Sequence, residues 1–206
     1  MNNRDYKQFA PGSYYHIYNR GNGKMDIFLG DDDFRFFIFR LRQNLFPDEE
    51  HSGRITLLPP QSFSLISYCL MPNHFHFLLR QERDIPTSKL LTKVCTSYSK
   101  YFNKKYERVG HLFQDQFKQI LVDENSYLIW LSAYIHQNPK VSGLITNLAD
   151  YKWSSYPDLV GLRDGGLCDK SIIMDQFKSP KDFEIFVESS HEVIKNRKDI
   201  EALLLD

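Results

Sequence analysis

Cysteine is scarce in this chain, and long apolar segments are absent. The three cysteines, Cys69, Cys95 and Cys168, are far apart and form no Cys-x-x-Cys pair. This spacing argues against a zinc ribbon or a disulfide framework and favours a reducing compartment. No signal peptide opens the chain and no apolar run could cross a bilayer, so we expect a soluble cytoplasmic protein with no membrane partner.

A net charge is also lacking, because 26 Lys and Arg residues balance 26 Asp and Glu residues. The charges are nevertheless unevenly placed. Residues 80–118 hold nine basic and four acidic side chains, whereas residues 164–206 hold six basic and ten acidic ones. A basic middle with an acidic tail is compatible with a polyanion site and a tail that competes for it, although ordinary surface scatter is the alternative.

One stretch, 67–80, organises the rest of the chain. It predicts a strand, a tight turn at Met71-Pro72-Asn73 and a second strand beginning at His74. Side chains alternate along a strand, so His74 and His76 share one face while the intervening phenylalanines share the other. Two imidazoles on a rigid strand are half of a divalent-metal site, but two hydrogen-bonded strand histidines are the plain alternative.

The remaining hydrophobic patterns predict an α+β fold. We expect an antiparallel sheet with helices packed on one face, leaving the other face free to present His74 and His76. Three adjacent aspartates are explained by the N-terminus of a helix rather than by a metal site. The expected elements are strands at 13–19, 62–70 and up to Val122, helices after Asp31-Asp32-Asp33, over 86–106 and over 124–137, and a polar connection over 47–60.

Two sets of basic residues are candidates for binding phosphate groups. Arg20 lies in the Gly-rich turn 19–23, where a plain turn is the alternative reading. The helix over 86–106 carries an apolar face and, opposite to it, a lysine stripe that either faces solvent or follows a phosphate backbone. The stripe consists of Lys89, Lys93, Lys100 and Lys104.

A second informative stretch, Tyr134-Ile-His-Gln-Asn138-Pro139, lies at a predicted helix end. Tyr134 and Asn138 are four residues apart and therefore share one helix face. A phenol and an amide oxygen could thus approach the histidine strand together, as a nucleophile and a third metal ligand. Tyr127 is the second candidate nucleophile. Because Pro139 disfavours the helical conformation of the residue before it, the helix should end at Asn138.

Four motifs together resemble one known family. They are Tyr-His-Ile-Tyr-Asn19-Arg20-Gly21, Met71-Pro-Asn-His74-Phe-His76, Tyr134-x-x-x-Asn138-Pro139 and Trp153-Ser-Ser-Tyr156, in that order. As a set they resemble the single-tyrosine transposases of the HUH superfamily, and among these the REP-associated tyrosine transposases of the IS200-like family. The resemblance covers roughly residues 13–157 and implies a ferredoxin-like HUH endonuclease domain.

The resemblance also implies the chemistry. His74, His76 and Asn138 would hold Mg²⁺ or Mn²⁺, and Tyr134 would form a 5′-phosphotyrosine with single-stranded DNA that carries a hairpin. Lys118 joins the DNA-binding candidates. Many relatives carry Arg at the position of Gln116, which puts one DNA contact in doubt. We take His111, His136 and Trp153 as structural residues.

The expected domains are a catalytic domain over 1–160 and an acidic helical extension over 161–206, which could lie over the basic region. Three functions are weighed: a strand-transferring transposase, a binding module without chemistry, and a replication or mobilisation nickase. The sequence leaves open a homodimer or a monomer, and it predicts a nucleoid-associated location.

Overall fold

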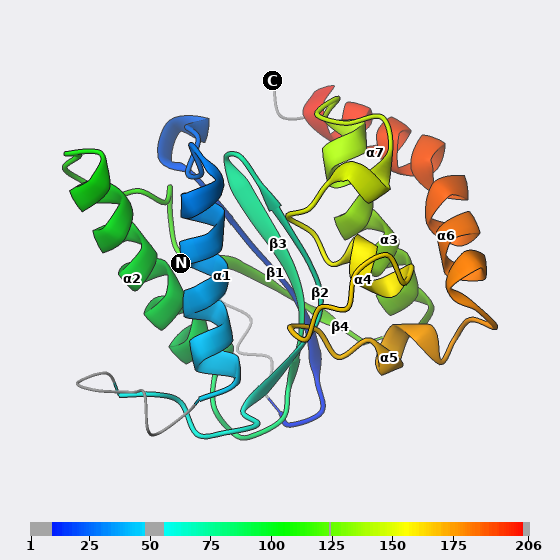
Figure 1. The fold of residues 1–206 in the computed structure, drawn as a ribbon, viewed down its shortest axis with the longest axis horizontal. Coiled ribbons are helices and arrows are strands. Elements are labelled where there is room, and N and C mark those ends of the chain that lie inside the picture. The colour runs from blue at the N-terminus through cyan, green and yellow to red at the C-terminus, as the bar shows by residue number, and fades with distance from the viewer. Residues whose placement is uncertain (1–9, 48–55, 124, 204–206) are drawn as a thin grey trace.

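A four-stranded antiparallel sheet forms the centre of the computed structural model, which describes residues 10–47, 56–123 and 125–203 (Figure 1). Its strands lie in the order β2-β3-β1-β4, and each neighbouring pair is antiparallel. They are β1 (Tyr14–Arg20), β2 (Phe63–Met71), β3 (His74–Gln81) and β4 (Lys118–Val122). The predicted α+β class and antiparallel sheet are confirmed.

Two helices cover one face of this sheet. They are α1 (Asp31–Leu45) and α2 (Thr87–Lys105), which lie side by side in Figure 1. Phe37 of α1 and Tyr98 of α2 are fully buried and pack their rings 5.1 Å apart. Phe75 and Phe77 of β3 point into the same core, as their alternation with the histidines predicts.

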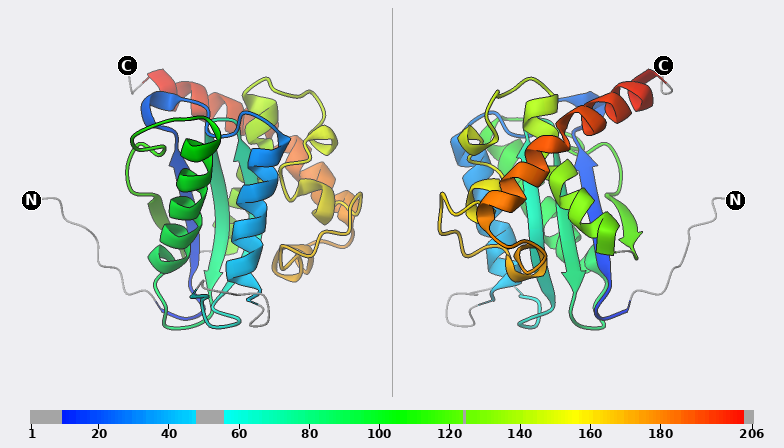
Figure 2. Two further views of the ribbon diagram at one scale, coloured as in Figure 1. Left: turned by 60° about the vertical axis from the view of Figure 1, so that its left-hand side comes forward. Right: turned by 90° about the vertical axis from the view of Figure 1, so that its right-hand side faces the viewer.

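The other face was expected to be free, and that expectation is wrong. Helix α3 (Asn125–Val141) covers part of it, with α4 (Tyr156–Leu159) in the same core and α6 (Pro180–Ser189) packed on α3 (Figures 1 and 2). The physical reason is that this face also carries apolar side chains, such as Met71 and Leu78, which need cover from water. Leu128, Leu131 and Ile135 of α3 supply it.

The C-terminal residues pack against α3. Phe183 and Val187 of α6 are fully buried in the same core as α3, and α7 (His191–Leu203) runs along α3 as well (Figure 2). We had expected these helices to lie over the basic region. They do not lie over the lysines of α2, because their apolar side chains are buried on the opposite side of the sheet. The division between residues 160 and 161 stays a prediction.

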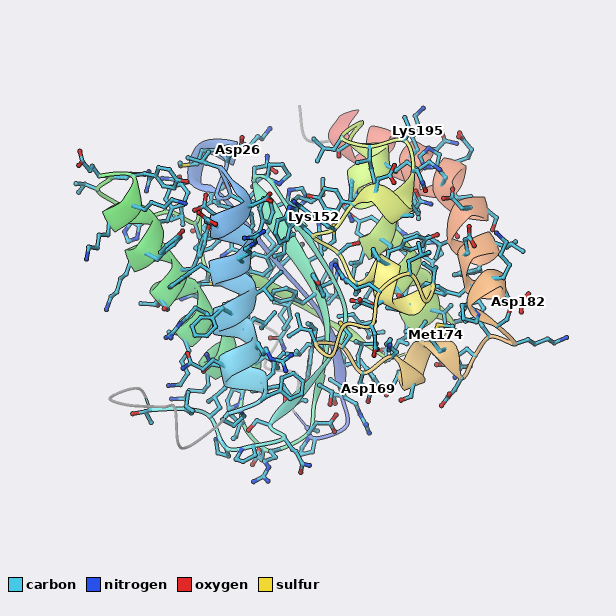
Figure 3. All side chains as sticks on the ribbon, viewed as in Figure 1. Asp26, Lys152, Asp169, Met174, Asp182 and Lys195 are labelled. Carbon is cyan, nitrogen blue, oxygen red and sulfur yellow. The ribbon has the colours of Figure 1, made fainter. Side chains whose placement is uncertain are left out.

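Residues after α3 close the outer edge of β2. The Leu70 amide donates to the Trp153 carbonyl at 2.9 Å, and the Asp169 amide donates to the Leu65 carbonyl at 2.8 Å. The Trp153 ring stacks on Phe34 of α1 at 4.6 Å, which fits the packing role expected of it. Figure 3 shows the neighbouring Lys152 between α1 and the helices of the other face; its Nζ lies 2.5 Å from Asp31. The short segments are η1 (Asn22–Lys24), η3 (Leu148–Asp150) and α5 (Ser171–Met174).

Helix α3 does not end at Asn138 but continues through Pro139 to Val141, so that expectation is wrong. Pro139 has no N–H for the carbonyl of Ile135, four residues earlier. The side-chain Nδ2 of Asn138 replaces it, donating to the carbonyls of Ile135 at 3.3 Å and Tyr134 at 2.8 Å. Asn138 thereby keeps the last turn helical despite the following proline.

Several expectations fall outside the described residues. They concern residues 48–55 of the polar connection and Glu124, the expected first residue of the third helix. Within the part of the chain that is described, no helix combines the length and apolar character that crossing a membrane requires.

Candidate active site

His74 and His76 lie on the same face of β3, as predicted from their spacing. Their ring centroids are 5.0 Å apart and the rings are perpendicular. Across the β1–β3 pair, His74 is opposite Arg20 and His76 is opposite Tyr18. His76 is 6% exposed and His74 is partly exposed, so the pair sits where buried sheet meets solvent.

Each of these histidines has a partner at its Nδ1 atom. His74 Nδ1 lies 2.6 Å from the Oδ1 of Asn73, and His76 Nδ1 lies 3.0 Å from the Nε2 of His16. Because the Asn73 oxygen can only accept, His74 Nδ1 donates, and the lone pair of this ring is then on Nε2. A metal ion would therefore bind both rings through Nε2, the arrangement that oriented metal-binding histidines use.

Sequence reasoning missed His16. It lies on β1 and is 6% exposed, and burial lowers its pKa to about 4, so it is neutral at pH 7. Its ring stacks on that of His76 at 5.2 Å. The available signal was strand alternation, which places His16 on the same face as Tyr14 and Tyr18. The register that brings β1 beside β3 is a tertiary feature.

Helix α3 brings Tyr134 to the histidines. The Tyr134 ring meets that of His76 edge-on at 5.8 Å and that of His16 edge-on at 6.1 Å. Tyr127, the second candidate nucleophile, lies two turns earlier on α3 and is separated from Tyr134 by Trp130, on which it stacks. Of the two tyrosines, Tyr134 is therefore the one that the fold sets against the histidine pair.

Asn138 is fully buried one turn after Tyr134. Since its Nδ2 donates to two backbone carbonyls, its Oδ1 is the atom that a metal could use. The described residues contain no cluster of three or more His, Cys, Asp or Glu side chains suited to a metal. Two imidazoles with fixed Nδ1 partners do fit a divalent ion, provided that an amide, water or phosphate oxygen completes its shell.

The DNA-binding candidates separate into two groups. Arg20 and Lys118 are exposed and lie on the histidine face of the sheet, with Arg20 Nε donating to the Oε1 of Gln114 at 2.6 Å. Lys118 Nζ lies 6.0 Å from the centre of the Tyr18 ring. The four lysines of α2 lie on the opposite side of the sheet, and one of them, Lys93, donates to the Thr56 carbonyl at 2.5 Å.

His136 and His111 were expected to be structural residues. His136 is buried, hydrogen-bonds through Nε2 to the Ser155 hydroxyl at 2.8 Å, and has its pKa lowered to about 3 by burial. His111 is exposed and lines, together with Gln116, a cavity of about 740 Å³ between α2 and the loop 110–117. Both positions agree with structural rather than metal-binding roles.

Residues 56–138 match the family model "Transposase IS200 like". The matched region includes both strand histidines, Tyr134 and Asn138. Over these residues the chain is similar to IS200-like transposases. No curated protein matches it.

A comparison of the whole chain with solved structures gives two transposases. A REP-associated tyrosine transposase bound to a REP hairpin has a TM-score of 0.51 and 16% sequence identity, over 73% of this chain and 79% of that one. A candidate transposase from Deinococcus radiodurans has a TM-score of 0.39 and 14% identity, over 69% of this chain and 95% of that one. The resemblance expected from the motifs is thus confirmed, and the first structure supports the fold.

Proposed function

We propose that this protein is a metal-dependent endonuclease and strand transferase that acts on single-stranded DNA ends bearing hairpins. Tyr134 is its nucleophile. The observation that carries the proposal is the edge-on contact of the Tyr134 ring with His76 at 5.8 Å, within a region that matches IS200-like transposases. The hairpin in the similar solved structure supports the choice of substrate.

His74 and His76 would hold Mg²⁺ or Mn²⁺ through their Nε2 atoms, with the Oδ1 of Asn138 as a third ligand. When bound, such an ion polarises a phosphate oxygen and neutralises the charge that develops on it. The protein's own part is to hold the two rings at fixed angles through Asn73 and His16. Arg20, opposite His74, can bind an adjoining phosphate.

The proposed cleavage of DNA by Tyr134 is a transesterification. The Tyr134 oxygen forms a bond to phosphorus while the bond from phosphorus to the 3′ oxygen breaks. The phenol loses its proton and the departing 3′ oxygen gains one, so the products are a 5′-phosphotyrosine and a free 3′-hydroxyl. Attack by a 3′-hydroxyl on the phosphotyrosine reverses the step and joins strands without ATP. Since an ordinary phenol has a pKa near 10, cationic surroundings must favour the phenolate.

The test is covalent capture of DNA. Wild-type protein is incubated with Mn²⁺ and a labelled DNA hairpin that has single-stranded tails, then separated on a denaturing gel. We expect a labelled protein band that is lost in Tyr134→Phe and retained in Tyr127→Phe, a matched change two turns earlier on the same helix. EDTA should remove the band.

Other results would redirect the assignment. DNA binding without a covalent band under any divalent metal would indicate a binding module without chemistry. A band that survives Tyr134→Phe but not Tyr127→Phe would move the nucleophile. Transfer of the captured strand to an added 3′-hydroxyl end distinguishes strand transfer from simple nicking. The same preparation, analysed by light scattering, decides between homodimer and monomer.

A further inference from the structure

A row of three aromatic rings runs along α3 and ends at the candidate nucleophile. Tyr127 stacks on Trp130 with centroids 5.9 Å apart and an interplanar angle of 17°, and Trp130 stacks on Tyr134 at 5.6 Å and 23°. All three rings are partly exposed. Positions i, i+3 and i+7 of a helix share one face, so the row follows from the sequence spacing.

Trp130 differs from its two neighbours in the row. Tyr127 and Tyr134 pack against the core on this side of the sheet, whereas Trp130 is not among the described residues of either core. The other tryptophan, Trp153, stacks flat on Phe34 and packs against both cores. A large aromatic ring that is partly exposed and does not pack in a core is typical of binding sites.

One basic side chain lies against Trp130, and two more lie on the sheet side of the Tyr134 site. The guanidinium carbon of Arg197, on α7, lies 5.2 Å from the centre of the Trp130 ring. On the sheet side of the same site, Lys118 lies over Tyr18, and Arg20 is exposed next to that strand pair. Basic and aromatic side chains thus lie together on both sides of Tyr134. Sites that bind single-stranded nucleic acid have this composition.

We propose that Trp130 and Arg197 form a stacking site for an unpaired base of the DNA substrate, next to the phosphate that Tyr134 attacks. The inference rests on the proposed function, since it names where that substrate binds. A base stacks on the exposed part of the indole, and the planar guanidinium, which lies over the ring in the structure, moves to stack on the base while its N–H edge meets the adjoining phosphate. Stacking of this kind accepts any base, so the site holds the strand without reading its sequence.

Fluorescence can isolate this ring because the chain contains only two tryptophans. In Trp153→Phe all tryptophan emission comes from Trp130, and in Trp130→Phe all of it comes from Trp153. Both changes are made with Tyr134→Phe and EDTA, so that no DNA is cleaved. A DNA hairpin with a thymidine tail is then added, and binding is followed in parallel by polarisation of a dye on the hairpin.

We expect the tail to quench Trp130 emission along the same curve as the polarisation, and to leave Trp153 emission nearly unchanged. Trp130→Leu, which keeps an apolar side chain but removes the ring, should weaken binding by about tenfold or more. Binding without quenching of Trp130, together with wild-type affinity of Trp130→Leu, would overturn the inference. Circular dichroism checks that each variant is folded.

Arg197 has a matched control on the same helix. Lys195 is exposed two residues earlier on α7, where Figure 3 labels it. Arg197→Gln should weaken binding of the tailed hairpin and reduce the slope of log affinity against log salt by about 0.7, the value for one phosphate contact on a single strand. Lys195→Gln should leave that slope unchanged. Equal slopes for both variants would remove Arg197 from the site.

The two proposals fail in different ways. If neither wild-type protein nor any variant binds the tailed hairpin, the proposed function fails and the stacking site with it. If the hairpin binds and the covalent band forms, but Trp130 and Arg197 respond as their controls do, only the stacking site is wrong.

Discussion

The Nε2 atom of His16 lies 3.0 Å from the Nδ1 atom of His76, on neighbouring antiparallel strands. The two rings are also stacked, at 5.2 Å and 22°. At such a contact one imidazole donates its N–H and the other accepts. If His76 binds a metal through Nε2, its Nδ1 carries the proton and His16 accepts it. His16 is then a positioning residue that fixes the ring and the tautomer of the ligand.

His16→Phe should therefore weaken metal binding. Phenylalanine keeps a planar ring on β1 but cannot accept a hydrogen bond, which leaves the His76 ring without its partner. We expect the affinity for Mn²⁺ to fall by about tenfold, the lower end of the range for such partners. The measurement is the electron paramagnetic resonance signal of free Mn²⁺ during titration, which needs no DNA and no activity.

Two further variants make this result specific. His111→Phe removes an exposed histidine that lines the cavity beside α2 and should bind Mn²⁺ as wild type does. His16→Gln retains an acceptor and should recover part of the affinity. His74→Ala should abolish binding at this site. If His74→Ala abolishes Mn²⁺ binding while His16→Phe binds Mn²⁺ with wild-type affinity, the metal site is supported and the positioning role of His16 is refuted.

The Asn138 side chain supports the end of α3. Its Nδ2 gives the Ile135 carbonyl the hydrogen bond that Pro139 cannot. Asn138→Ala should lower the free energy of unfolding by about 1–3 kcal/mol, the cost of leaving a buried carbonyl unsatisfied. Urea denaturation of metal-free protein measures this.

The double variant tests the cause. In a Pro139→Ala background the backbone N–H of residue 139 can donate a hydrogen bond to the Ile135 carbonyl. Asn138→Ala should therefore lower the free energy of unfolding clearly less in this background than in wild type. Strictly additive costs would mean that the side chain of Asn138 does not substitute for the missing N–H.

Local patterns were sufficient to predict the four strands and the first three helices, apart from the end of α3. Alternation along β3 placed the histidines opposite the buried Phe75 and Phe77, and the helical spacing of α2 separated its buried side chains from its lysines. Strand alternation and helical spacing extend over only a few neighbouring residues, so both can be recognised directly in the sequence.

Relations between distant segments could not be predicted in this way. The contact of His16 with His76 depends on strand register, which the whole sheet fixes. The continuation of α3 past Pro139 depends on one side chain folding back on its own helix. The packing of the C-terminal residues on α3 depends on Phe183 and Val187, which lie more than 40 residues further along the chain.

Asp33 joins the start of α1 to the end of α2. Its buried carboxylate accepts hydrogen bonds from the Leu29 and Gly30 amides, from Lys105 and from Tyr106. Burial alone would raise its pKa, but the hydrogen bonds from Lys105 and Tyr106 outweigh burial and lower it from 3.8. Asp33→Asn should reduce the free energy of unfolding at pH 7 by about 2 kcal/mol, because an amide nitrogen would face donors.

The pH dependence of this effect has a definite sign. A carboxyl with a lowered pKa in the folded state contributes its stability fully above the unfolded value of 3.8, and loses it as the pH falls through the folded value. The gap between wild type and Asp33→Asn should therefore shrink below pH 3.8. Asp32→Asn, an exposed neighbour in the same helical turn, should show little gap at any pH. A gap that persists unchanged at low pH would contradict the charge-based explanation.

The separation of the basic residues into two faces predicts two kinds of DNA-binding variant. Arg20 lies opposite His74 on the histidine face, whereas the lysines of α2 lie across the sheet from it. Arg20→Gln should slow single-turnover cleavage at saturating DNA by about tenfold, since a charge-assisted contact at the reacting phosphate is lost.

A quadruple variant replaces Lys89, Lys93, Lys100 and Lys104 with Gln. It should weaken binding of the hairpin and flatten its salt dependence, because phosphate contacts are removed. At saturating DNA it should cleave at the wild-type rate, since these ammonium groups lie on the far side of the sheet from Tyr134. Quenched-flow kinetics with both variants separates affinity from rate. Equal slowing by the lysine variant and by Arg20→Gln at saturation would mean that the strand reaches the nucleophile from the α2 side.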